Sequence, residues 1–282
     1  MKTHFNKVVI IGVGLMGASI GINLVRRKMA REVIGVGRNL ANLKEALRKK
    51  AIHKMVRVQQ AVSLLDGLSQ SDLVILCSPI QSILEYLPKI SRSVLVTDVG
   101  STKFSIVQKA NHLRLRFVGS HPIAGTEQTG ARAGDFNLFH GGWCVLTPAK
   151  NASSSDTVQI TALWKALGMR CVVMSAEKQD ALFGILSHLP HVLAYSLMET
   201  VSRLVSLENL KFSFGSFKDT TRVASSSPEM WRDIFLENRK NVLRAISLYE
   251  RDLGRLKKMI LKKEGSLLLR FLSGVQKKRL AL

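Results

Sequence analysis

A glycine-rich turn near the start of the chain constrains the fold more than any other feature. The β-branched run at residues 8–11 leads into Gly12, Val13, Gly14, Leu15, Met16 and Gly17, and a helical pattern follows at 18–28. Three glycines at this spacing permit a tight turn, close approach of a pyrophosphate, and close packing of helix on strand. The helix N-terminus offers free N–H groups to a phosphate. All six residues are therefore expected to contact a dinucleotide, the alternative being a glycine-rich packing turn.

The same region carries no charge from residue 8 to 25 and follows Lys2 and Lys7, as a signal peptide or membrane span would. Four glycines interrupt it, and Asn23 lies near its end. We interpret it as a buried strand turning into a helix, and expect a soluble protein without a membrane partner.

Apolar runs alternate with helical patterns through the first half of the chain. The predicted strands are 8–11, 33–36, 73–77, 94–97, 117–119, 143–147 and 171–174, and the predicted helices between them include 18–28, 40–50 and 82–90. Such alternation predicts a mostly parallel sheet covered on both faces. We therefore expect an α/β fold whose Rossmann-like, dinucleotide-binding domain spans residues 1–174.

From about residue 175 the pattern is helical only, which predicts an all-α domain over residues 175–282. Residues 181–204 form one expected helix, kinked by Pro190. A second is expected to start at Pro228 and run to about residue 263. Two rows of apolar residues at seven-residue spacing run along it, and they predict a seam buried against a helix of the same chain or of a second copy. The rows are Phe235, Val242, Tyr249 and Leu256, and Ile246, Leu253 and Ile260.

The charge of the chain is strongly basic, with 42 Lys and Arg against 20 Asp and Glu, a net +22. A nucleic acid or an anionic surface is one interpretation of that excess. The basic residues are dispersed, however, and aromatic residues do not alternate with them as a stacking platform requires. We therefore expect no specific nucleic-acid partner, whereas an anionic small-molecule substrate would benefit from the field.

Three cysteines, Cys77, Cys144 and Cys171, lie far apart and without the spacing of metal ligands. They argue against a disulfide framework and against a zinc site. We expect a reducing, cytoplasmic setting and no bound metal.

The end of the second predicted strand bears on the choice of dinucleotide. An NAD site usually has Asp or Glu there, which binds the ribose hydroxyls. This chain has Gly37 followed by Arg38. Because a guanidinium can pair with a 2′-phosphate, NADP is favoured and NAD stays possible, with Arg38 then stacking on the adenine. Ser78 and Pro79 follow another strand and are expected at the nicotinamide side of the crevice.

A second group of reactive side chains lies in residues 119–127, which read Gly-Ser-His-Pro-Ile-Ala-Gly-Thr-Glu. A single histidine is more often structural than catalytic. His121, however, follows a predicted strand and lies in a loop bounded by glycine and proline, where α/β enzymes place their chemistry.

The glycine-rich turn and residues 121–127, taken with three further motifs, resemble the prephenate/arogenate dehydrogenases of tyrosine biosynthesis. The further motifs are Ser101-Thr-Lys, Ser187-His-Leu-Pro-His191, and Thr221-Arg-Val-Ala followed by Pro228-Glu-Met-Trp. The resemblance covers about residues 6–252. It implies a homodimer formed through the C-terminal helices, and an enzyme that oxidatively decarboxylates prephenate or arogenate with NAD or NADP.

The resemblance also implies roles for individual residues. His121 matches the histidine that hydrogen-bonds the ring hydroxyl, Ser101 a serine that orients it, and Arg222 the arginine that binds a substrate carboxylate. His191 and Thr126 match further active-site positions, and Gly215 and Trp231 lie near the substrate. His191 is preferred over His188, which either contacts substrate or cofactor or is a packing residue.

The chemistry fits these residue types. The ring hydroxyl must lose its proton as hydride leaves, and a neutral histidine is suited to accept it. Loss of CO₂ then restores aromaticity and needs neither a metal nor a covalent nucleophile. Two alternatives are a β-hydroxyacid-type dehydrogenase, whose lysine-based site is not evident here, and a non-catalytic dinucleotide-sensing protein, which would need neither His121 nor Arg222.

Overall fold

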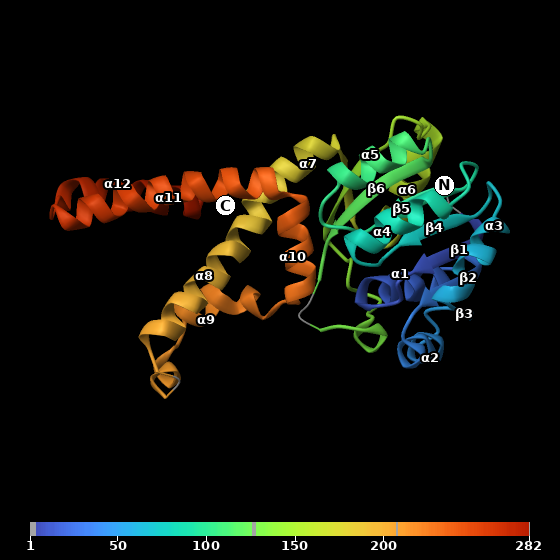
Figure 1. The fold of residues 1–282 in the computed structure, drawn as a ribbon, viewed down its shortest axis with the longest axis horizontal. Helices are drawn as coiled ribbons and strands as arrows, with labels where there is room; N and C mark the ends of the chain where they lie inside the picture. The colour runs from blue at the N-terminus through green and yellow to red at the C-terminus, as the bar shows by residue number, and fades with distance from the viewer. Residues whose placement is uncertain (1–3, 126–127, 207, 282) are drawn as a thin grey trace.

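The computed structural model describes residues 4–125, 128–206 and 208–281, and consists of an α/β body and a set of projecting helices (Figure 1). One eight-stranded sheet, in the order β3-β2-β1-β4-β5-β6-β7-β8, organises the body. All neighbouring strands are parallel except β6 and β7. The strands are β1 Phe5–Ile11, β2 Ala30–Gly37, β3 Lys54–Arg57, β4 Leu73–Leu76, β5 Leu95–Asp98, β6 Arg116–Ile123, β7 Trp143–Pro148 and β8 Arg170–Val173.

Helices cover both faces of this sheet, as expected for strands that are apolar on both sides. Consecutive residues of β1 show the division: Val8 and Ile10 belong to one core, and Val9 and Ile11 belong to the other. The first core lies under α1, α2 and α6, and the second lies under α3, α4 and α5. These helices are α1 Leu15–Arg26, α2 Leu40–Arg48, α3 Ala61–Asp66, α4 Ile80–Tyr86, α5 Phe104–His112 and α6 Ser154–Ala166. The predicted α/β class is confirmed.

The second half is helical, as predicted. Two limbs project from the body in Figure 1, one made of α8 and α9 and the other of α11 and α12, while α10 packs against α4. The helices are α7 Ala176–Phe183, α8 Leu189–Leu204, α9 Ser216–Thr221, α10 Pro228–Glu237, α11 Arg239–Leu261 and α12 Gly265–Leu280.

The predicted single helix from Pro228 to residue 263 is wrong, because it breaks at Asn238 between α10 and α11. The amide of Asn238 donates to the carbonyl of Asp180 at 2.8 Å and lies 3.0 Å from His188 Nδ1. These contacts join residues far apart in the sequence and hold the helix break in place. A local sequence pattern therefore does not predict the break. Helix α12 follows α11 within the predicted all-α region, although no individual helix was predicted for these residues.

The irregularity expected at Pro190 takes the form of a π-helical turn, Gly184–His188, directly before α8. Proline lacks the N–H that would continue an α-helical ladder, so the preceding turn widens. The continuous stretch Ala176–Leu204 is long and apolar enough to cross a membrane by composition, with a mean hydropathy of 1.4. It nevertheless buries three polar side chains against the rest of the chain, those of Gln179, Asp180 and His188.

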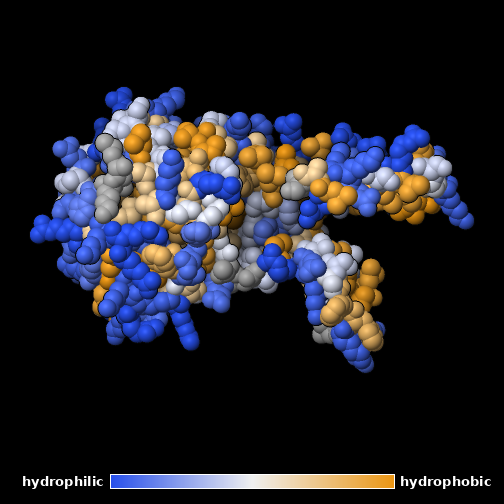
Figure 2. Space-filling view, turned by 180° about the vertical axis from the view of Figure 1, so that it is seen from behind, coloured by the Kyte–Doolittle hydropathy of each residue, from blue (hydrophilic) through white to orange (hydrophobic). Residues whose placement is uncertain are grey.

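Large apolar side chains are exposed on both limbs. Figure 2 shows that they gather on the sides of the two limbs that border the gap between them. The predicted seam on α11 is only partly buried in the single chain: Val242 is buried, whereas Tyr249, Leu253 and Ile260 are 39%, 50% and 58% exposed. The distal half of the seam is therefore largely exposed in the single chain, although α12 contacts α11.

Candidate active site

The glycine-rich turn lies where β1 has neighbours that lead to opposite sides of the sheet. Strand β1 pairs with both β2 and β4, and ligands of open α/β sheets bind at the carboxyl ends of such strands. Gly12 has φ +96°, and a Cβ there would lie 2.5 Å from the carbonyl oxygen of Cys77. A Cβ on Gly17 would collide with the carbonyl of Gly12. Both positions therefore require glycine.

A cleft of about 300 Å³ opens beside this turn. Its lining residues come from the ends of β1, β2 and β4 and from the helices that follow: Ile11, Gly12, Val13, Gly14, Val36, Gly37, Arg38, Asn39, Asn42, Val58, Cys77, Ser78, Pro79, Ser82 and Tyr86. Leu15, Met16 and Gly17 form the first turn of α1.

The cleft fits a dinucleotide in two respects. Apart from Gly14 and its chain neighbours, no atom of the described residues lies within 4 Å of where a Cβ on Gly14 would be, which leaves room for a phosphate at the N-terminus of α1. The hydroxyl of Ser78 is buried without a hydrogen-bond partner among those residues, so a ligand group can pair with it. The chemistry of the lining therefore suits a nicotinamide dinucleotide.

A second cavity, of about 490 Å³, joins this cleft to the helical half. Met16, Arg38, Ser78 and Pro79 contribute to it from the α/β body. The helical half contributes Ser227, Glu229, Met230, Arg232, Asp233 and Ile234. Ser101 also lines this cavity. Its backbone carbonyl accepts a hydrogen bond from the side chain of Gln179.

His121 lies within β6 rather than in a loop beyond a strand, which corrects the sequence-based expectation. The antiparallel pairing of His121 with Val145 extends the strand through this residue. The ring is buried, and Phe183 contacts it edge-on with 4.6 Å between ring centroids. Burial, together with the nearby positive charge of Lys103, holds the pKa of His121 well below its usual range. The imidazole is therefore neutral at physiological pH.

Two buried contacts fix the surroundings of His121, and sequence reasoning missed both. Gln179 on α7 lies with its side-chain nitrogen 2.7 Å from His121 Nδ1 and donates to the carbonyl of Ser101 at 3.0 Å. Lys103 and Asp98 form a fully buried ion pair, and Asp98 also accepts from the backbone N–H of Ser120 at 3.2 Å. The sequence offered one signal: a lysine so close to the end of an apolar strand is unusual in a core unless it is paired.

The remaining predicted histidines lie at the end of the π-helical turn, His188, and in the first turn of α8, His191. His188 is fully buried, and burial lowers its pKa to about 4. Its Nε2 has no hydrogen-bond partner in the described ranges. His191 stacks on Trp231 at 3.5 Å between centroids, and its Nδ1 pairs with the carbonyl of Ser187 at 2.9 Å. Burial lowers the pKa of His191, and the positive charge of Arg222 lowers it further. Arg222 is therefore close enough to His191 to interact with it electrostatically.

One predicted residue of the described ranges stands apart from this group. Gly215 precedes α9 with φ +54°, is exposed, and has open space, as far as the structure is described, where a Cβ would lie. Thr126 falls outside the described residues. The single chain thus brings His121, Ser101, His188, His191, Trp231 and Arg222 into one connected region, through the contacts given above.

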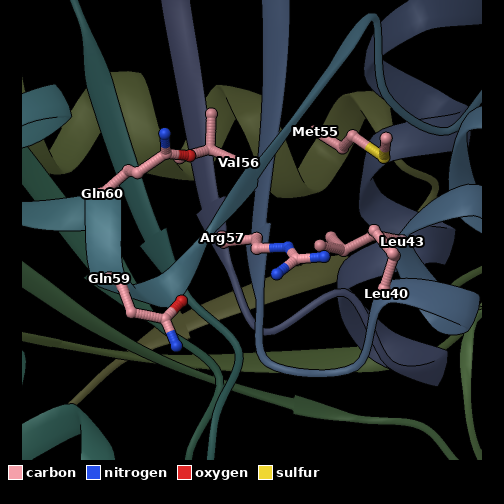
Figure 3. Close-up of a pocket in the computed structure, with 7 residues that line it drawn as sticks. All are labelled: Leu40, Leu43, Met55, Val56, Arg57, Gln59 and Gln60. Carbon is pink, nitrogen blue, oxygen red and sulfur yellow. The ribbon is translucent and has the colours of Figure 1, made fainter.

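A further hollow of about 500 Å³ lies between α2 and β3, next to the dinucleotide cleft (Figure 3). It is lined by Leu40, Leu43, Met55, Val56, Arg57, Gln59 and Gln60. Figure 3 shows the guanidinium of Arg57 directed towards the two leucines of α2. This lining offers one cation, two amides and apolar groups, which is not a set of acid, base and nucleophile.

The fold and site together define a class: a nucleotide-dependent oxidoreductase with a Rossmann-type domain and a helical second domain. Comparison with known sequences specifies it. Residues 20–173 match the family model described as the prephenate dehydrogenase nucleotide-binding domain, and residues 175–274 match the prephenate dehydrogenase dimerisation domain. The chain belongs to the prephenate dehydrogenase family.

Individual relatives agree. The cyclohexadienyl dehydrogenase of Zymomonas mobilis is 34% identical, over 99% of this chain and 97% of that protein. The prephenate dehydrogenase of Bacillus subtilis is 30% identical, over 96% of this chain and 74% of that protein. The family and the dehydrogenase activity expected from the motifs are confirmed.

Solved structures extend the likeness to three dimensions. The prephenate dehydrogenase of Aquifex aeolicus, in complex with hydroxyphenyl propionate and NAD⁺, superposes with a TM-score of 0.91 at 34% identity, covering 99% of each chain. The arogenate dehydrogenase of Synechocystis gives a TM-score of 0.79 at 27% identity, covering 97% of this chain and 98% of that one.

Proposed function

We propose that this chain oxidatively decarboxylates prephenate, arogenate or both, as a step in tyrosine biosynthesis. The observation that carries the proposal is the neutral, buried imidazole of His121, which connects through Gln179 and Ser101 to the cavity beside the dinucleotide cleft. When bound, NAD(P)⁺ accepts hydride from the ring carbon that bears the hydroxyl.

The residues of the chain then have separate tasks in the proposal. His121 meets the ring hydroxyl, and its low pKa keeps it neutral and able to handle a proton. Ser101 helps to orient that hydroxyl, and Thr126, which lies outside the described residues, is proposed as a further active-site residue on the motif alone. Arg222 binds a substrate carboxylate, since a guanidinium matches a carboxylate with two hydrogen bonds.

The substrate end of the site is assigned to α8 and α10. His191 lies flat on Trp231, and this pair forms a wall against which a six-membered ring can pack. His188 lies behind it, hydrogen-bonded to Asn238, and supports the wall. Gly215, which is exposed in the single chain, is assigned to a part of the site that forms only in the assembled protein.

The dinucleotide is proposed to be NADP. Arg38 follows β2, lines the cleft, and stands where an NAD site usually has an acid. Gly37 next to it leaves space for the additional phosphate. NAD⁺ is the dinucleotide in the Aquifex aeolicus complex, so a direct comparison of the two cofactors decides the matter.

A homodimer is proposed to form through α8, α11 and α12. These helices carry exposed apolar side chains on the sides of the limbs that border the gap in Figure 2. Burying such faces against a second copy removes apolar surface from water, and isologous pairing makes the same residues serve both partners. The boundary at residues 174 and 175 and the cytoplasmic location stay predictions.

The test is an assay of each of the two substrates, prephenate and arogenate, with each of the two cofactors, NAD⁺ and NADP⁺. The absorbance of the reduced cofactor and the release of CO₂ are measured in each of these combinations. We expect turnover with at least one substrate and a higher kcat/KM with NADP⁺. Absence of turnover in all four combinations would contradict the proposed activity, and a higher kcat/KM with NAD⁺ would contradict the cofactor assignment alone.

A further inference from the structure

A buried amide outside the motifs of the family resemblance contacts the ring of His121. Gln179 is fully buried on α7, one residue before Asp180 and one helical turn before Phe183. The carboxylate of Asp180 accepts from the backbone N–H groups of Lys103 at 2.7 Å and Phe104 at 3.0 Å. Helix α7 is therefore anchored on the segment that carries Ser101, and Gln179 has a fixed place beside His121.

The orientation of this amide follows from its partners. A backbone carbonyl can only accept, so the atom 3.0 Å from the carbonyl of Ser101 must be the amide nitrogen. The same nitrogen lies 2.7 Å from His121 Nδ1 and supplies its second N–H there. The side-chain oxygen of Gln179 is buried and has no partner among the residues that the structure describes.

An imidazole nitrogen that accepts a hydrogen bond carries no proton. His121 is neutral, since burial and the positive charge of Lys103 disfavour a second proton. The other groups near it are the Asp98 carboxylate, which is paired with Lys103, and the ring of Phe183. The single proton of the imidazole must therefore reside on Nε2.

We propose that Gln179 is a positioning residue that sets the tautomer of His121 and holds it, at rest, with the proton on Nε2. Because Gln179 occupies Nδ1, only Nε2 can meet the ring oxygen of a substrate, and at rest it meets that oxygen as a donor. This role for Nε2 rests on the proposed function, whereas the tautomer itself does not.

Acceptance of the hydroxyl proton at Nε2 then requires the amide of Gln179 to turn over. Rotation by about 180° about its last bond places the side-chain oxygen against Nδ1 and breaks the hydrogen bond to Ser101. The imidazole exchanges its proton with water, giving up the proton on Nε2 and taking one up on Nδ1, where the Gln179 oxygen accepts it. Nε2 takes the hydroxyl proton as hydride leaves the ring carbon for the bound nicotinamide. When the C–C bond to the carboxylate breaks, its electrons reach the ring oxygen, which recovers that proton from Nε2.

The tautomer can be measured without any turnover, by ¹⁵N NMR of histidine-labelled protein in which the His121 signals are assigned by their loss in His121→Asn. We expect wild-type His121 to show an unprotonated Nδ1 and a protonated Nε2. In Gln179→Glu, the carboxylate can only accept, so the proton should move to Nδ1. A protonated Nδ1 in the wild type, or an unchanged tautomer in Gln179→Glu, would overturn the proposal.

Kinetics of folded variants supply the second readout. Gln179→Met keeps the shape but offers no donor, and we expect kcat to fall by about tenfold or more with KM within about threefold. In Gln179→Glu, the added charge should raise the acid limb of the kcat/KM profile by about one pH unit. Gln108→Glu, on the exposed face of α5, adds the same charge as a control. A wild-type kcat in Gln179→Met or a wild-type pH profile in Gln179→Glu would contradict the role in the reaction.

Discussion

His121, the proposed proton acceptor, stays neutral where an exposed histidine would be partly charged. Substrate carboxylates and the basic surface make the site rich in charge, yet His121 lies within a strand, under Phe183 and beside Gln179. Burial is the largest cause of the low pKa of His121. A proton taken up by such a group is easily returned, as the two halves of the proposed reaction require.

Replacement of His121 by Asn tests this role. Asn keeps a polar group but cannot accept and return a proton, so we expect kcat to fall by about 10²–10⁴-fold. Binding of NADP⁺ should change by less than about threefold, because the cleft is formed by other residues. Initial rates and a fluorescence titration measure the two quantities, and a kcat close to wild type would remove His121 from the mechanism.

Replacement of Arg38 by Asp tests the choice of cofactor. The acid repels a 2′-phosphate and can bind ribose hydroxyls, so we expect the ratio of kcat/KM for NADP⁺ over NAD⁺ to fall by about tenfold or more. Arg57→Asp is the matched control, since Arg57 lines the neighbouring hollow rather than the cleft. An unaltered ratio in Arg38→Asp would mean that this guanidinium does not contact the phosphate.

At the scale of elements, the junction between the two halves is built from irregular helices. The π-helical turn Gly184–His188 and the break at Asn238 face each other, and the amide of Asn238 joins them by contacting both Asp180 and His188. A buried polar group of this kind lowers stability when its partner is lost. The junction is consequently sensitive to protonation of His188.

That sensitivity predicts a pH dependence of stability. The pKa of His188 is about 4 in the folded protein against an ordinary value of 6.5, so the unfolded chain binds the proton more tightly. The free energy of unfolding should be insensitive to His188 above pH 6.5 and should fall between pH 6.5 and 4, by ~3 kcal/mol for this group. His121 and His191 add to the fall, since their pKa values are also lowered.

Urea unfolding at several pH values measures this loss. In His188→Asn, the difference in unfolding free energy between about pH 7 and about pH 4.5 should be smaller than in the wild type. In His112→Asn, at an exposed position on α5, that difference should stay as it is. If His188→Asn loses as much stability as the wild type on acidification, burial of that imidazole is not the cause.

At the scale of the whole molecule, the two limbs carry large apolar side chains that stay exposed to water in a single chain. Leu253 and Ile260 project from α11, and Phe212 and Phe214 are 75% and 86% exposed before α9. Contiguous exposed patches of this kind usually mark an interface. The domain that carries them matches the dimerisation domain of the family.

A charge placed in this surface should separate the copies. Leu253→Glu puts a carboxylate among apolar groups, which is costly without a partner, so we expect the apparent mass in light scattering to approach that of one chain. Lys258→Glu, on the opposite side of α11, should leave the mass unchanged. A Leu253→Glu protein with the wild-type mass would place the interface elsewhere.

The glycine turn, the alternation of strands and helices, and the change to helix near residue 175 were readable along the chain. Each is a local pattern: Gly12 and Gly17 are required by contacts with adjacent segments, and strands buried on both faces are apolar throughout. The motifs around His121, His191 and Arg222 indicated the family for the same reason, because each is a short run of fixed spacing.

Other features depended on residues far apart in sequence. The placement of His121 inside β6 required β7 to pair with it, and the end of α10 required Asn238 to reach Asp180. Gln179 carries no motif, and only folding brings its amide from 58 positions away to the imidazole. Sequence alone therefore determined the fold class, the glycine turn and the catalytic candidates. The tertiary structure decided the surroundings of His121, because burial lowers its pKa and a long-range contact places the Gln179 amide beside its Nδ1.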